Sequence, residues 1–178
     1  MIETDGFLWS PGIDLSERIQ TLDGEQIEKC FSDHADIVSA ISYILSELLD
    51  LDKARHPQLI QRWSMALEWL AEGSREENDA ISLSKIGTSL DVLANAGKSD
   101  NIVDMVCNLL DVTPDCIALT KPSIITMKKA IEMIYNDGRS KILHGNHYER
   151  LKSYESEKNL GQIISRQCLL NAALRIKN

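Results

Sequence analysis

Apolar residues recur every three or four positions over most of this chain, a spacing that gives an α-helix one apolar face. The first such run predicts one long amphipathic helix over residues 25–49. His34 falls on or beside its apolar face, where a core or boundary role is expected. The apolar positions of this run are Ile27, Cys30, Phe31, Val38, Ile41, Leu45, Leu48 and Leu49.

Three further helices are predicted between residues 57 and 115. Pro57 suits a first helical turn, and the helix that it opens is expected to end at Gly73. The acidic residues 76–79 suit the N-terminus of the next helix, which runs to Gly97. Ser99 or Asp100 caps a shorter helix that is interrupted at 113–115. The positions expected to be buried are Leu59, Ile60, Trp63, Leu67, Leu70, Ile81, Leu83, Ile86, Leu90, Leu93, Ile102, Val106, Leu109 and Leu110.

Two more helices follow, and no segment has the pattern of a strand. Pro122 opens the first, and the second follows a charged stretch at 149–158. Gly138 either lowers helix propensity or permits close approach of a neighbouring helix, and both readings stay open. Lys128 is expected to extend its charge from the apolar face into water. The expected inward positions are Ile124, Met127, Lys128, Ile131, Tyr135, Gly138, Ile142, Leu160, Ile163, Ile164, Cys168, Leu170 and Leu174.

These patterns together predict an all-α fold. Residues 1–24 lack a regular period and form an irregular N-terminal arm, in which the sequence Trp9-Ser10-Pro11-Gly12 predicts a turn. Residues 25–178 form a single-domain bundle of five or six helices. With 43% hydrophobic residues, a chain of 178 residues can bury a sizeable core.

Composition narrows the functional classes further. No apolar run approaches the roughly 20 residues of a membrane span, and the first residues do not form a signal peptide. The four cysteines are scattered and form no CxxC pair, so four free thiols in the cytoplasm are expected, with no metal and no cofactor. Phosphate-binding, dinucleotide-binding, zinc-protease and serine-hydrolase motifs are all missing. The carboxylates of the acidic part are interpreted as solvated faces.

Charge is unevenly distributed along the chain. Residues 1–120 hold 8 Lys and Arg against 22 Asp and Glu, whereas residues 121–178 hold 11 against 5. The net charge of −8 therefore conceals a basic final third that can attract a polyanion. The alternative is that the two parts neutralise each other through contacts within or between chains.

Arg139 and His144 lie five positions apart in this basic third, directly before Gly145. Arginine offers a rigid, permanently charged fork that suits phosphate oxygens, and histidine exchanges protons near neutral pH. The pair can therefore support phosphoryl chemistry without a metal. The simpler alternative is that cationic residues and a glycine only terminate a helix, since both are favoured at helix C-termini.

The segment 134–145, with the core Arg139-Ser140-Lys141-Ile142-Leu143-His144-Gly145, resembles the signature helix of the HEPN superfamily, in particular its Apea-like group. Weaker similarity covers roughly residues 40–176, including 65–70 and 86–93. The resemblance implies a cytoplasmic, metal-independent endoribonuclease that serves as a toxin or anti-phage defence effector. An antitoxin or defence-system protein is then a possible partner. The other function found in that superfamily is a non-catalytic module for dimerisation or partner docking.

The resemblance also assigns roles to residues. Arg139 and His144 are the expected catalytic pair, cleaving RNA through attack of its 2′-hydroxyl to leave a 2′,3′-cyclic phosphate. On an ideal α-helix the pair is about 140° apart, so a homodimer through the 123–145 helix is expected to complete the cleft. Ser140, His147 and Tyr135 are expected to support the pair, with Tyr135 also suited to the core. The expected RNA-binding residues are Lys128, Lys129, Lys141 and Arg150.

Overall fold

The fold was analysed in a computed structural model, which describes residues 2–4, 7–9, 23–121, 123–143 and 153–178. The chain divides into two compact units, residues 1–35 and residues 36–178. Among its described residues, the first unit holds two short strands and one helix. Its elements are β1 (Ile2–Thr4), β2 (Phe7–Trp9) and α1 (Gly24–Asp33).

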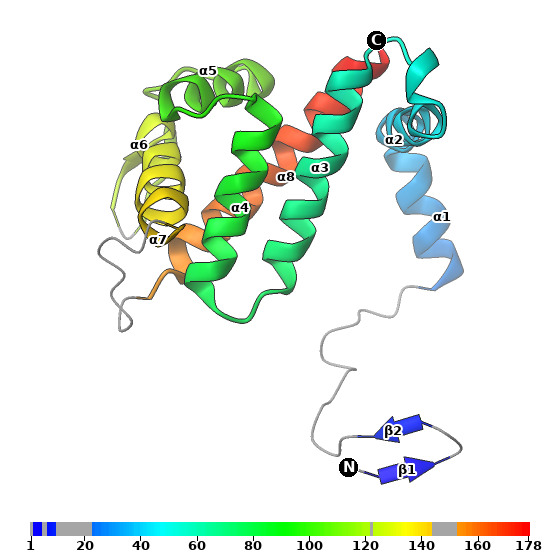
Figure 1. The fold of residues 1–178 in the computed structure, drawn as a ribbon, viewed down its shortest axis with the longest axis horizontal. Helices are drawn as coiled ribbons and strands as arrows, with labels where there is room; N and C mark the ends of the chain where they lie inside the picture. The colour runs from blue at the N-terminus through cyan, green and yellow to red at the C-terminus, as the bar shows by residue number, and fades with distance from the viewer. Residues whose placement is uncertain (1, 5–6, 10–22, 122, 144–152) are drawn as a thin grey trace. The chain divides into compact units, whose positions relative to one another are not determined.

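The second unit is largely helical (Figure 1). Within it, α4 packs against α3 on one side and against the segment from α6 to α7 on the other, and α8 packs across them. The predicted all-α fold class is confirmed. The elements of this unit are α2 (Ala35–Leu48), the 3-10 turn η2 (Leu51–Lys53), α3 (Pro57–Arg75), α4 (Asp79–Ala94), α5 (Ser99–Leu110), β3 (Ile117–Leu119), β4 (Ile125–Thr126), α6 (Met127–Glu132), the π-helix η3 (Met133–Ser140), α7 (Lys141–Leu143) and α8 (Glu155–Lys177).

The prediction of one long helix over 25–49 is wrong, because the helix ends and restarts around His34. Asp23 and Gln26 form a capping box at the start of α1, and the backbone of His34 leaves the helical conformation at its end. His34 is exposed rather than at the core, as are Ile27 and Phe31. The apolar period correctly indicated an amphipathic helix, but a period does not say whether a partner covers its face.

The pair α3 and α4 begins where the sequence predicts and packs closely. Pro57 occupies the first turn of α3, and the Asn78 side chain accepts hydrogen bonds from two backbone N–H groups at the start of α4. Gly73 does not end α3 but lies inside it, where a Cβ would come within 2.9 Å of Ile86. The buried Ser82 hydroxyl donates to the Gly73 carbonyl at 2.6 Å. Close backbone approach, rather than helix termination, explains this glycine.

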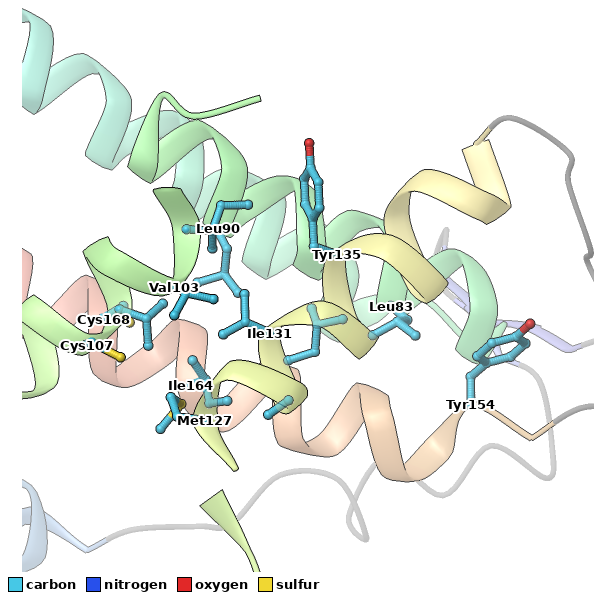
Figure 2. Packing of buried hydrophobic residues seen from close by; sticks show 14 of the residues in the cluster. Leu83, Leu90, Val103, Cys107, Met127, Ile131, Tyr135, Tyr154, Ile164 and Cys168 are labelled. Atoms are coloured by element: carbon cyan, nitrogen blue, oxygen red, sulfur yellow. The ribbon is translucent and has the colours of Figure 1, made fainter. Parts of the chain in front are cut away.

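The core consists of two adjoining clusters of buried aliphatic side chains in the second unit. One joins α2, α3, α4 and α8, and there the Trp63 indole donates to the Leu169 carbonyl at 2.8 Å. The other joins α4, α5, α6, η3 and α8 (Figure 2). In α3, α4 and α8, four positions predicted to be inward are instead exposed, so the buried face of each helix is narrower than its apolar face; they are Leu59, Leu67, Ile81 and Ile163.

The expectations of no strand and of a helix opening at Pro122 are also wrong. β3 and β4 form a small antiparallel hairpin, and β1 pairs with β2 in the first unit. The helix begins only at Met127, where the Thr126 hydroxyl accepts from a backbone N–H of the first turn. Ile124 therefore lies outside the helix and is 73% exposed. Strands of two or three residues are too short to leave a periodic signal in the sequence.

The helix that carries the Arg139 motif is not an α-helix along its whole length. It changes to a π-helix over Met133–Ser140 and returns to α geometry in α7. π-Helical turns are rare and occur frequently at functional sites. Tyr135 and Gly138 are both buried in this segment, which confirms their predicted inward positions.

Candidate active site

The π-helix η3 brings two adjacent residues into close contact with α4. A Cβ on Gly138 would lie 2.6 Å from Cγ of the fully buried Leu83, so only glycine fits there without a shift. One residue later, the Cβ of Arg139 packs over Gly87, where an added Cβ would lie 2.8 Å away. Of the two readings of Gly138, close approach of a neighbouring helix is therefore the observed one. This packing anchors the base of the Arg139 side chain.

The Arg139 guanidinium is held by two side chains. Its Nη2 lies 3.0 Å from Asp91 Oδ2, and its Nη1 donates to the Tyr135 hydroxyl at 3.2 Å. Its Cζ also lies 5.3 Å from the centroid of the Tyr135 ring, within the range of a cation–π contact. In Figure 2 the hydroxyl of Tyr135 points away from Ile131, so the ring packs in the core while its polar end reaches outward. Tyr135 thus has the predicted core position, and its hydroxyl contacts Arg139; its support of a catalytic pair stays a prediction.

Asp91 is the residue of this candidate site that sequence reasoning missed. Its side chain is only 13% exposed, contrary to the expectation that carboxylates of the acidic part lie on solvated faces. Its other oxygen, Oδ1, accepts from the backbone N–H of Gly97 at 2.9 Å. Asn95 and Gly97 both adopt positive φ, so the turn after α4 is shaped to bring that N–H back to Asp91. The backbone of Gly97 therefore holds Oδ1 of this carboxylate, while Oδ2 faces Arg139.

Donors remain on Arg139 after these contacts. A guanidinium carries five N–H groups, one on Nε and two on each Nη. Nε is buried and has no hydrogen-bond partner among the residues that the structure describes. Asp91 and Tyr135 each engage one Nη, and the side chain retains 27% exposure. Two Nη hydrogens therefore have no acceptor among the described residues, and a planar guanidinium is a donor that suits phosphate.

The predicted RNA-binding lysines differ in how they are compensated. Lys129 lies 3.5 Å from Glu132, and Lys141 donates to Asp137 at 2.6 Å. The hydrogen bond to Asp137 raises the pKa of Lys141. Lys128 is exposed and does not lie on an inward face; it makes no ion pair within the described ranges. Lys128 is thus the lysine of this group whose charge stays available.

The structure describes one of the four remaining predicted site residues. Ser140 is half-buried at the end of η3. His144, His147 and Arg150 lie outside the described residues. The Arg139-to-His144 offset and the support expected from Ser140 and His147 therefore stay predictions.

Charges of the acidic and basic parts of the chain meet inside the second unit. Arg139 pairs with Asp91, and Lys158 of α8 pairs with Asp79 at the start of α4. In both pairs a cation from the basic final third faces a carboxylate from the first 120 residues. The alternative of intramolecular neutralisation is therefore realised at these two places, which reduces the field available for a polyanion.

Neither protein-family models, nor curated proteins, nor solved structures gave a match to this chain. Across the described ranges, no group of three or more His, Cys, Asp or Glu side chains is placed to hold a metal ion. No described helix has both the length and the apolar character needed to span a membrane.

Proposed function

We propose that this protein is a metal-independent endoribonuclease whose catalytic residues are Arg139 and His144. The observation that carries the proposal is the orientation of Arg139. Its stem is packed on α4, Asp91 and Tyr135 each contact one Nη nitrogen, and two Nη hydrogens have no acceptor among the described residues. A guanidinium oriented before substrate arrives stabilises developing charge without reorganising, which is the basis of electrostatic catalysis.

In this proposal the substrate supplies the nucleophile. The 2′-hydroxyl of RNA attacks the adjacent phosphorus, a P–O bond forms, and the bond to the 5′-oxygen breaks. The products are a 2′,3′-cyclic phosphate and a 5′-hydroxyl. His144 transfers a proton as general base or general acid, a role worth typically about 10²–10⁴-fold in rate. Arg139 neutralises the pentavalent phosphorane. DNA lacks the 2′-hydroxyl and is spared.

The cleft is proposed to form between two copies of the chain that pair through the helix carrying residues 127–143. The reason is the expected angular offset of about 140° between positions 139 and 144, a value that assumes α-helical geometry although Arg139 itself lies in the π-helix. In such a dimer one His144 removes the 2′-hydroxyl proton while the second protonates the leaving 5′-oxygen. The proposed setting is a toxin or anti-phage defence effector, with growth arrest on expression as its cellular readout.

The second candidate function is a non-catalytic helical module for dimerisation or partner docking. The specific observation that favours it is the same ion pair. Asp91 neutralises Arg139, and Tyr135 covers part of its face, so the arginine can serve to hold η3 on α4 alone. In that case Arg139 contributes to stability and not to chemistry.

Three substitutions separate the two functions. If Arg139 is catalytic, Arg139→Ala abolishes RNA cleavage, and Arg139→Lys restores little because a point charge lacks the bidentate fork. Arg166→Ala, which removes an exposed arginine of α8, is the matched control and should cleave like wild type. If wild type cleaves no RNA, the non-catalytic function is favoured. If wild type cleaves RNA and both Arg139 variants cleave equally well, the catalytic role of Arg139 is refuted.

A further inference from the structure

A pocket of about 250 Å³ opens between α3, α5 and α8, separate from the residues around Arg139. Its walls are aliphatic and include Leu93 at the end of α4, Leu109 of α5, and Ala172 and Ile176 of α8. At about 30 Å³ per molecule, this volume equals roughly eight waters. A compact pocket with mostly apolar walls and a few polar groups is typical of a small-molecule site.

The polar residues that line this pocket are all basic. They are His56, Arg62 and Arg175, and no carboxylate is among the lining residues. Arg175 is fixed by Asn108, which accepts from Nη1 through its side chain at 2.6 Å and from Nη2 through its backbone carbonyl at 2.5 Å. The orientation of this guanidinium is therefore set before any ligand arrives.

Arg62 is the arginine of this pocket that has no partner among the described residues. It is half-buried on α3, makes no hydrogen bond or ion pair there, and keeps its guanidinium nitrogens in contact with water. Its donors can therefore take an acceptor in the pocket without first giving up another partner. The pocket also lies beside the N-terminus of α3, where His56 is the N-cap residue and makes no capping hydrogen bond through its side chain. The exposed N–H groups there add positive potential to that of the arginines.

We propose that this pocket binds a small amphipathic anion, with its apolar body against the aliphatic walls and its carboxylate on Arg62. The volume sets the size, at roughly eight to ten non-hydrogen atoms. The described lining residues include two arginines and no carboxylate, so the expected ligand carries a negative charge. A bidentate pair with a half-buried arginine accounts for the selection of a carboxylate over a neutral head. This site is independent of the proposed ribonuclease function.

The test uses octanoate as the probe and the full chain labelled with ¹³C at the methionine methyl groups. Met105 lines the pocket, so its methyl resonance should shift in a saturable way as octanoate is added. The exposed Met65 of α3 lies outside the lining and should not follow that titration. Octanol has the same chain without the charge and should bind at least about tenfold more weakly, as expected when a charge-assisted hydrogen bond is lost.

Two variants locate the anion and the apolar body separately. Arg62→Gln should weaken octanoate binding at least about tenfold, whereas Arg166→Gln, on the exposed face of α8, should leave it within about twofold. Ala172→Leu adds atoms inside the pocket and should abolish the Met105 shift; an unchanged methyl spectrum elsewhere establishes that this variant is folded. The proposal is overturned if octanol binds as well as octanoate, if Met65 shifts in parallel with Met105, or if Arg62→Gln binds like wild type.

Discussion

Gly138→Ala is expected to destabilise the protein because it separates η3 from α4. The new Cβ would lie 2.6 Å and 2.8 Å from two carbons of Leu83, whereas carbon atoms in contact are normally about 3.5–4.0 Å apart. Leu83 is fully buried and has no room to retreat. Overpacking of this kind costs up to about 3 kcal/mol, and replacing glycine by alanine in a helix returns about 1 kcal/mol. The expected net loss in free energy of unfolding is about 2 kcal/mol.

The assay is reversible denaturation in urea or by heat, followed by far-ultraviolet circular dichroism. For a chain of this length, about 2 kcal/mol corresponds to a fall in Tm of about 4–8 °C. Asn136→Ala is the matched control, because Asn136 is exposed in the same π-helix and its loss should change stability by less than about 0.5 kcal/mol. If the free energy of unfolding of Gly138→Ala lies within about 0.5 kcal/mol of wild type, the inference that close packing of η3 on α4 positions Arg139 is refuted.

Further predictions concern Asp91, the cysteines and the oligomer. Asp91→Asn keeps an acceptor for the Gly97 N–H but loses the ion pair with half-buried Arg139. The free energy of unfolding should therefore fall by about 1–2 kcal/mol, and the rate of RNA cleavage should fall with it. If both stay unchanged, the role proposed for Asp91 is contradicted. Burial raises the pKa of Cys168 to about 12 from its ordinary 9.0. Between pH 9 and pH 12 the Cys168 thiol therefore loses its proton only in the unfolded state. The free energy of unfolding should then fall as pH rises from 9, by at most about 1.4 kcal/mol per pH unit. Cys168→Ala should remove this contribution to the pH dependence. Iodoacetamide should label exposed Cys30 rapidly and Cys168 only on unfolding, as followed by mass spectrometry. Light scattering should report about 40 kDa, twice the 20.0 kDa of one chain, and a strict monomer would contradict the shared cleft.

The helices were predictable where local signals and packing agree. Pro57 marks the start of α3, and α4 begins within the acidic turn around Asn78, because these signals act within one helical turn. The break at His34 and the exposure of α1 were not predictable, since an apolar period reveals a face and not what covers it. The hairpin before Met127 is likewise too short to have a period of its own.

The candidate site was predictable in its chemistry but not in its geometry. Arg139 stands out from residue type and spacing alone, and burial of Tyr135 follows from the apolar stripe. The π-helix did not follow from the sequence, and neither did the contact of Gly138 with Leu83, because these two residues are far apart in sequence. Asp91 is one carboxylate among 22 Asp and Glu in the first 120 residues. Only the packing of η3 on α4 distinguishes it from a solvated residue.

The central claim is metal-free RNA cleavage by Arg139 and His144, and the most direct test is the chemistry of the product ends. A short RNA and its DNA counterpart are incubated in EDTA with wild type, with His144→Ala and with His34→Ala as the histidine control. We predict 2′,3′-cyclic phosphate ends from RNA alone, a rate at least about 10²-fold lower for His144→Ala, and wild-type activity for His34→Ala. Equal cleavage by wild type and His144→Ala, or cleavage that EDTA abolishes, would contradict the account.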